Sequence, residues 1–151
     1  MFTISQETAG QPEAVGLIAQ LDKYQNALYP AASAHTLDLS QLGDESLIFL
    51  MIRHETGRAV GCGSIVLYPD YGEIKRVFIL AEYRRRGLGD KLLMALEHAA
   101  VGKGVSILRL ETGVEQPSAV TLYQRNGYHF CSPFPPYQAD PLSHFMEKKI
   151  Q

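Results

Sequence analysis

The run Arg84–Gly89 (Arg-Arg-Arg-Gly-Leu-Gly) constrains the fold most, because it stands between an apolar strand pattern and a long amphipathic helix pattern. A strand, a glycine turn and a helix in succession indicate a helix packed on a sheet. Glycines at the start of a helix let backbone N–H groups approach an anion, which the helix dipole and the arginines also favour. The run therefore predicts an anion site, although a solvated basic turn explains these six residues alone equally well.

The remainder of the chain alternates between the two periodicities. Strands are predicted at 2–5, 46–53, 59–67, 72–80, 106–110, 128–131 and 143–149, and helices at 12–29, 39–42, 89–100 and 117–125. In the first helix five residues follow the 3.6-residue period, and Leu17 and Tyr24 widen the apolar face. The five are Val15, Ile18, Leu21, Gln25 and Leu28. This order predicts an α/β fold with a mixed sheet, in a single domain over residues 1–151.

Composition narrows the class of protein. Hydrophobic residues make up 46% of the 151 residues and charged residues 20%, which is typical of a soluble globular chain. No apolar run approaches the roughly 20 residues that span a bilayer, and the N-terminus lacks signal-peptide features. The two cysteines form no C-x-x-C pair. We therefore expect a cytoplasmic protein without a membrane partner.

Charge and histidine spacing exclude further classes. The net charge of −2 argues against nucleic acid as a partner. Six of the 14 Lys and Arg residues fall within 75–91, and such a local basic spot suits a small polyanion. The five histidines lack the spacing of metal ligands, so we expect no metal ion.

Two common nucleotide motifs do not fit the glycine run. A Walker A loop needs Lys and then Ser or Thr after its last glycine, whereas Asp90 follows Gly89. A dinucleotide fingerprint needs a third Gly or Ala where Leu92 stands. The remaining pattern is Arg-x-x-Gly-x-Gly between a strand and a helix.

Three blocks in order resemble the GNAT superfamily of acetyl-CoA-dependent acyltransferases. Glu73–Ile79 resembles its central strand, Ala81–Gly89 its pyrophosphate loop, and Ala119–Tyr128 its late helix with a Leu-Tyr pair. Ala81 stands where the family usually has proline. The segment 133–148 resembles a small bacterial, YsnE-like subgroup. The resemblance implies a central, mostly antiparallel sheet with one splayed parallel pair, flanked by about four helices.

The resemblance also assigns the donor site. The backbone of Val77, Phe78 and Ile79 would bind the pantetheine arm of acetyl-CoA, and the loop would hold its pyrophosphate. The residues implied for cofactor binding are Val77, Phe78, Ile79, Arg84, Arg85, Arg86, Gly87, Leu88, Gly89 and Asp90. Val77 and Ile79 can equally be ordinary core residues, since backbone contacts leave their side chains free to pack.

Catalytic candidates follow from the chemistry of acetyl transfer to an amine. A general base is needed, and Glu73 at the start of the central strand leads, with Glu111 at the end of the neighbouring strand second. Either carboxylate can instead be a salt-bridge partner, as Glu73 would be with Lys75. Tyr123 in the Leu-Tyr pair is the candidate general acid for the leaving thiolate, or else a core residue.

The acceptor is the least constrained part of the prediction. A small amine metabolite is expected, with Tyr29, His35 and Tyr137 as substrate contacts. A protein N-terminus or lysine is the competing acceptor, and a non-catalytic acyl-CoA-binding regulatory domain is the alternative from another class. Related domains often dimerise, so a homodimer is compatible with the resemblance.

Overall fold

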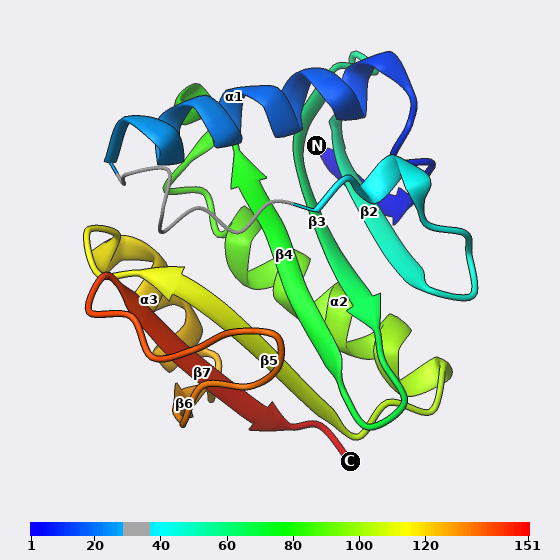
Figure 1. The fold of residues 1–151 in the computed structure, drawn as a ribbon. Helices are drawn as coiled ribbons and strands as arrows, with labels where there is room; N and C mark the ends of the chain where they lie inside the picture. Colours follow the sequence, from blue (N-terminus) through cyan, green and yellow to red (C-terminus); the bar gives the residue numbers. More distant parts are fainter. Residues whose placement is uncertain (29–36) are drawn as a thin grey trace.

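The computed structural model describes residues 1–28 and 37–151 (Figure 1). Its α-helices are α1 (Pro12–Leu28), α2 (Leu88–Gly102) and α3 (Pro117–Arg125), and its short 3-10 helices are η2 (Leu39–Gln41) and η3 (Ala81–Tyr83). The strands are β1 (Phe2–Gln6), β2 (Leu47–His54), β3 (Ala59–Leu67), β4 (Gly72–Ile79), β5 (Ile107–Gly113), β6 (His129–Phe130) and β7 (Ser143–Lys149). The predicted α/β class is confirmed, with η2 in place of the short second helix.

The strands form one seven-stranded sheet in the order β1-β2-β3-β4-β5-β7-β6. Every neighbouring pair is antiparallel except β4 and β5, which are parallel. The expected mostly antiparallel sheet with one parallel pair is therefore confirmed. β5 runs to Gly113 because its pairing with β7 continues to Gly113 opposite Ser143. Glu111 thus lies inside β5, and the predicted strand end near Leu110 was too early.

β4 and β5 separate after a very short ladder. Their pairing covers only three residue pairs, from Gly72 opposite Leu108 to Ile74 opposite Leu110. Beyond them β4 stays paired with β3, while β5 pairs with β7. Figure 1 shows β4 and β5 diverging from their shared starting end. The expected splay is confirmed.

A β-bulge lies on β4 where the strands separate. The register of β3 and β4 shifts between Cys62 and Ser64, and Arg76 has a left-handed backbone with φ of 57°. A bulge inserts one unpaired residue, bends the strand and increases its twist. The bend therefore turns the second half of β4 away from β5.

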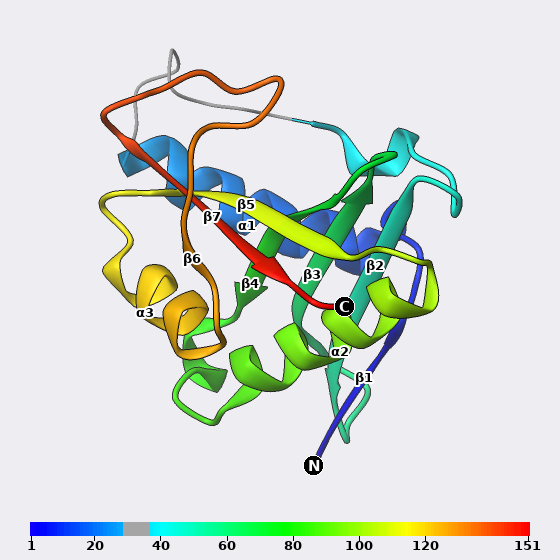
Figure 2. The same ribbon diagram turned by 90° about the horizontal axis from the view of Figure 1, so that it is seen from below.

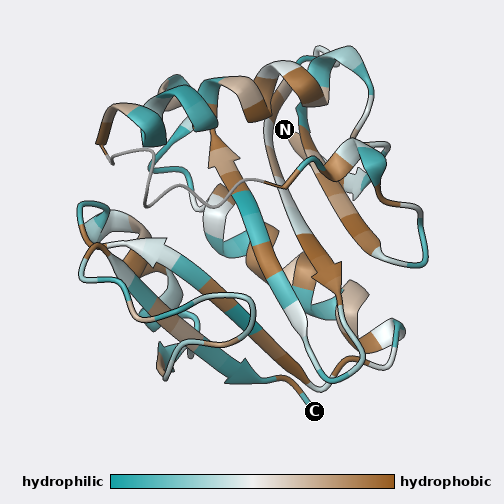
Figure 3. Cartoon of the chain, in the orientation of Figure 1, coloured by the Kyte–Doolittle hydropathy of each residue, from teal (hydrophilic) through white to brown (hydrophobic). Residues whose placement is uncertain are grey.

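Helices cover both faces of the sheet. α1 lies on one face and α2 on the other, with α3 beside α2 (Figure 2). Leu92, Leu93 and Leu96 of α2 are fully buried, and burying each such side chain contributes about 1.5–3 kcal/mol. Figure 3 shows the matching hydrophobic stretches along β2, β3 and the beginning of β5.

The buried face of α1 differs from the predicted one. Ala14, Leu17 and Leu21 are buried, whereas Val15, Tyr24 and Leu28 are exposed. The helix contains apolar residues at two overlapping phases, and packing on β3 and β4 selects the phase of Leu17. Periodicity alone placed the stripe about one residue out of phase.

A small aromatic cluster holds the C-terminal loop (residues 131–142). Phe134, Tyr137 and Phe145 pack together, with Tyr71 and Cys131 at their edge. The guanidinium of Arg109 lies 4.8 Å from the Tyr71 ring centroid, and the Tyr71 hydroxyl donates a hydrogen bond to the Pro135 carbonyl at 2.9 Å. The loop lies on the same side of the sheet as α1 (Figure 2).

Candidate active site

The connection from β4 to α2 presents backbone amides at the start of a helix. η3 ends at Tyr83, Arg85 and Gly87 have positive φ of 63° and 75°, and α2 begins at Leu88. Among the described residues, the amides of 85–89 donate to no backbone carbonyl, and no side chain caps the helix. Free N–H groups at a helix N-terminus form an anion site, so the loop is suited to an anionic group.

The two glycines of this loop have different roles. Gly87 has φ of 75° and open space where a Cβ would stand, so it supplies a left-handed backbone conformation. A Cβ on Gly89 would lie 3.2 Å from a methyl carbon of Leu122 on α3. Gly89 therefore permits the close packing of α2 against α3.

The arginines of the loop are exposed and partly engaged with aromatic rings. Arg84 Nε donates to the Ile79 carbonyl at 2.8 Å, and its guanidinium lies 5.7 Å from the Phe78 ring centroid. The Arg86 guanidinium lies 5.4 Å from the centroid of Tyr83. Arg84 thus ties the loop to the end of β4.

Two of the predicted cofactor residues are turned away from solvent or paired. Leu88 is buried in the core, so only its amide faces the loop. Asp90 binds the guanidinium of Arg125 and the amide of Asn126, and the hydrogen bonds from Arg125 hold the pKa of Asp90 below its ordinary value. For Asp90 the cofactor prediction therefore applies to the backbone amide.

The second half of β4 has one unpaired edge. Phe78 and Ile79 pair with Cys62 and Gly61 of β3, and within residues 1–28 and 37–151 no strand pairs with their other edge. Val77, Phe78 and Ile79 are half-buried. Successive residues of a strand direct their backbone groups to opposite edges, so only some of these amides and carbonyls lie on the open edge, and the Ile79 carbonyl accepts a hydrogen bond from Arg84 Nε.

Glu73 is a buried carboxylate at the point where the ladder ends. Its side chain is 2% exposed. Glu73 Oε2 accepts a hydrogen bond from the Tyr137 hydroxyl, and Lys75 Nζ lies 3.4 Å from the same oxygen. The salt bridge to Lys75 that competed with the catalytic role is present, so the carboxylate has both a cation and a phenol as partners.

Glu111 lies on β5 on the same side as Tyr137. Its Oε2 accepts a hydrogen bond from Ser143 Oγ at 2.5 Å. Burial raises the pKa of Tyr137 above its ordinary value, and the negative charges of Glu73 and Glu111 raise it further. The structure therefore places the Tyr137 phenol against Glu73 and within electrostatic range of Glu111.

Tyr123 stands apart from this group, on α3. It is 7% exposed and packs edge to face on Tyr128, with ring centroids 5.7 Å apart. Burial raises the pKa of the Tyr123 phenol above its ordinary value. The group stays protonated at neutral pH, which is the state that a general acid needs.

The sequence did not predict two polar residues of the site, Lys75 and Ser143. Two of the predicted substrate contacts cannot be located, because they lie outside the described residues. Lys75 was considered only as an ion-pair partner, although its i+2 spacing on β4 puts it on the same face as Glu73. Ser143 gave no sequence signal, because its contact depends on the pairing of β5 with β7. Tyr29 and His35 lie outside the described residues.

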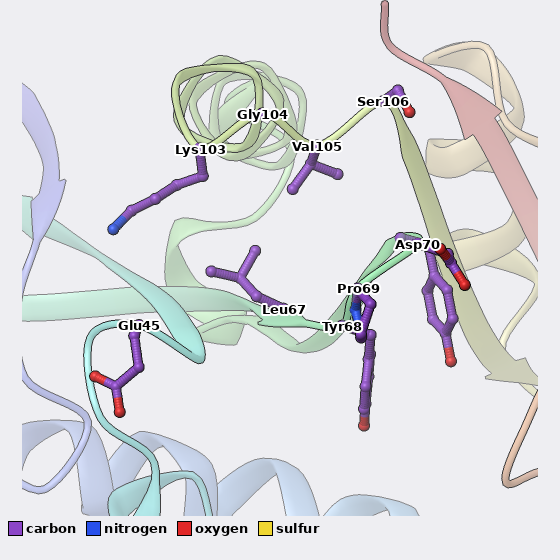
Figure 4. A pocket seen from close by; sticks show the side chains of 10 residues that line it. Glu45, Leu67, Tyr68, Pro69, Asp70, Lys103, Gly104, Val105 and Ser106 are labelled. Atoms are coloured by element: carbon purple, nitrogen blue, oxygen red, sulfur yellow. The ribbon is translucent and has the colours of Figure 1, made fainter.

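A shallow pocket lies at the opposite end of the sheet from the glycine loop. It is lined by the turn between β3 and β4 and by the connection from α2 to β5 (Figure 4). Leu67, Tyr68, Lys103 and Ser106 are among its lining residues. Because β4 and β5 begin at this end, the pocket is separate from the splay.

Neither a metal cluster nor a membrane-spanning helix is found among the described residues. Residues 1–28 and 37–151 contain no group of three His, Cys, Asp or Glu side chains placed to hold a metal ion. In the same part of the chain no helix has the length and hydropathy needed to cross a membrane.

The fold and the anion loop define a class, the acyltransferases with a splayed parallel strand pair. A family model described as Acetyltransferase (GNAT) family matches residues 17–128. The chain therefore belongs to the GNAT family and is an N-acetyltransferase-type enzyme.

Relatives and a solved structure agree with this assignment. "IAA acetyltransferase" from Azospirillum brasilense is 43% identical over 150 residues, covering 98% of this chain and 97% of that protein. YsnE of Bacillus subtilis, an uncharacterized N-acetyltransferase, is 34% identical over 124 residues, covering 80% of this chain and 82% of YsnE. A crystal structure described as an acyl-CoA N-acyltransferase from Klebsiella pneumoniae has a TM-score of 0.90 and 47% identity, covering 100% and 99% of the two chains.

Proposed function

We propose that this enzyme transfers an acetyl group from acetyl-CoA to an amine of a small metabolite, directly within a ternary complex. The observation that carries the proposal is the splay of β4 and β5, which opens beside the glycine loop. When bound, acetyl-CoA supplies an activated thioester and a thiolate leaving group. The acyl-CoA named in the description of the Klebsiella structure supports this donor.

The chain binds the donor mainly through its backbone. Val77–Ile79 offers a strand edge to the amide groups of the pantetheine arm. The amides of 85–89 and the dipole of α2 hold the pyrophosphate, and Arg84 and Arg86 add positive charge. A backbone N–H near Phe78 polarises the thioester carbonyl, as an oxyanion hole does.

The acceptor amine must lose a proton before or during attack. An alkylamine with a pKa of about 10.4 is only about 0.1% neutral at pH 7.4, a cost of roughly 4 kcal/mol. Glu73 accepts the proton, directly or through a water, as the amine nitrogen forms its bond to the carbonyl carbon. Tyr123 donates its proton to the sulfur as the C–S bond breaks, so that CoA leaves as the thiol.

A small acceptor is favoured over a protein chain. The C-terminal loop, anchored by its aromatic cluster, lies over the side of the sheet that carries Glu73 and Glu111. Such a loop narrows access for an extended polypeptide. Transfer to a protein N-terminus or lysine is the competing proposal.

Release of the CoA thiol from acetyl-CoA across a panel of small amines and short peptides tests the proposal. We expect amine-dependent release with small amines, and a decrease in kcat of about 10²–10⁴ for Glu73→Gln at unchanged acetyl-CoA affinity. Full activity of Glu73→Gln together with loss in Glu111→Gln would move the base to Glu111. Tight acetyl-CoA binding without release by any acceptor would instead favour a non-catalytic acyl-CoA-binding domain.

A further inference from the structure

Tyr137 reaches Glu73 from a distant part of the chain. It lies on the C-terminal loop, 64 residues away in sequence, and its hydroxyl donates a hydrogen bond to Glu73 Oε2 in the buried interior. Tyr137 is itself 9% exposed. A buried phenol bonded to a buried carboxylate fixes the orientation of that carboxylate.

Lys75 completes the group from β4. Its Nζ donates a hydrogen bond to the Tyr137 hydroxyl oxygen at 2.8 Å and lies 5.5 Å from the centroid of the same ring. The Tyr137 hydroxyl thus accepts a hydrogen bond from Lys75 and donates one to Glu73. This direction of hydrogen bonding favours a charged carboxylate that accepts, which is the form a general base needs.

We propose that Tyr137 is a positioning residue for the general base, and that the C-terminal loop holds Glu73 in its reactive orientation through the Tyr137 hydroxyl. The inference rests on the proposed function, in which Glu73 is the base. It replaces a direct substrate contact for this residue, because the hydroxyl is engaged with Glu73 and Lys75 and the ring is packed on Phe134 and Phe145.

The side chains around Tyr137 determine how the group of Glu73, Lys75 and Tyr137 responds to pH. The charged and titratable side chains near it come from three segments: Tyr68 and Tyr71 before β4, Lys75 on β4, and Arg109 and Glu111 on β5. Removing the Tyr137 hydroxyl withdraws a donor from the carboxylate. The acidic limb of the kcat profile should therefore move to higher pH, by about one unit.

The first experiment is a double-mutant cycle on kcat with the best amine of the panel. We expect Tyr137→Phe to lower kcat about tenfold with the acceptor KM unchanged. Because Tyr137 acts through Glu73, Tyr137→Phe should cause no further decrease in a Glu73→Gln background. Two effects that multiply, or a raised KM at unchanged kcat, would make Tyr137 an independent substrate contact and overturn the inference.

Matched variants control for loop anchoring. Tyr71→Phe removes a hydroxyl from the same cluster, one that bonds the Pro135 carbonyl and not Glu73. We expect it to keep the wild-type kcat within about twofold and the wild-type pH profile. If Tyr137→Phe does not fold, Lys75→Met serves instead, with a smaller decrease in kcat and the same direction of pH shift. An unchanged pH profile of kcat in Tyr137→Phe and in Lys75→Met contradicts the proposal.

A spectroscopic arm does not depend on the acceptor. The chain has eight tyrosines, and the ¹³Cζ signal of Tyr137 can be assigned as the one missing in Tyr137→Phe. It should change with pH as Glu73 takes up a proton, and Glu73→Gln should abolish that change. A signal that ignores Glu73→Gln disproves the contact. If the Tyr137 signal depends on Glu73 as expected but Glu73→Gln keeps a normal kcat, the contact stands and the proposed base is overturned.

Discussion

Arg125 donates two hydrogen bonds to Asp90, from Nε to Oδ1 and from Nη2 to Oδ2, each at 3.0 Å. The pair joins the first turn of α2 to the last turn of α3. Asp90 also accepts a hydrogen bond from the side chain of Asn126 at 2.8 Å. The one acidic side chain in the first turn of α2 is therefore paired, which limits its repulsion of an anion on the loop.

Asp90→Asn should lower stability at neutral pH but not at low pH. The hydrogen bonds from Arg125 hold the pKa of Asp90 below its ordinary value, so the native state favours the ionised form. This contribution is complete above about pH 4–5 and is lost as the pH falls through the lowered pKa. Urea unfolding should show a small decrease for Asp90→Asn at pH 7 that disappears near pH 2. A decrease of equal size at both values would exclude the ion pair as its cause.

Gly89→Ala should destabilise the fold through packing. The added Cβ would lie 3.2 Å and 3.3 Å from the two terminal methyl carbons of Leu122, and such overpacking costs about 1–3 kcal/mol. Gly87→Ala is the matched control, because it meets open space and strains only the backbone. Leu122→Ala should relieve the defect of Gly89→Ala and not that of Gly87→Ala. Thermal unfolding of the three single variants and of the two double variants with Leu122→Ala checks this, and a missing rescue would contradict the assigned contact.

Tyr123→Phe should lower kcat without weakening acetyl-CoA binding. We expect a decrease of about 10- to 100-fold if the phenol protonates the leaving thiolate. Since burial raises the pKa of Tyr123, its ionisation should cause no loss of rate between pH 7 and about pH 10. Tyr128→Phe is the control, because its hydroxyl bonds Glu97 at 2.9 Å. Equal losses of kcat in the two variants would point to a packing effect.

The two thiols should differ in reactivity. Burial raises the pKa of the fully buried Cys62 to about 12, so about one molecule in 10⁴ carries the thiolate at pH 8. Burial raises the pKa of Cys131 as well, but that side chain is only partly buried. A thiol reagent should therefore label only Cys131 in the native protein, and slowly. After denaturation it should label both Cys131 and Cys62. Rapid labelling of Cys62 would mean that the core opens readily.

The sequence predicted the strand, the turn and the helix around the glycine run, for a local reason. The strand before the glycine run and the helix after it are encoded within about 30 residues, and a turn that begins a helix has few geometries. The splay was expected only through the family resemblance, because no periodicity reports where a ladder stops. The left-handed Arg76 at the bulge has no signature in the sequence.

The acid–base group was predicted as separate residues and not as a cluster. Glu73, Glu111 and Tyr137 were each singled out, but their meeting depends on the C-terminal loop folding back over β4 and β5. That return is fixed by packing of Phe134 and Phe145 and by the register of β7 on β5. Contacts between residues so far apart in sequence follow from tertiary packing, which alternation of apolar residues does not encode.

The extra residue at Arg76 reverses the parity of β4. Before the bulge, Glu73 and Lys75 occupy odd positions and face the C-terminal loop. After it, the odd position Ile79 faces Gly89 on α2. Odd-numbered residues of β4 thus carry the acid–base side chains on the loop face before the bulge. After the bulge, the odd-numbered Ile79 packs on the opposite face, against α2. Any redesign of the acceptor side has to count positions outward from the bulge.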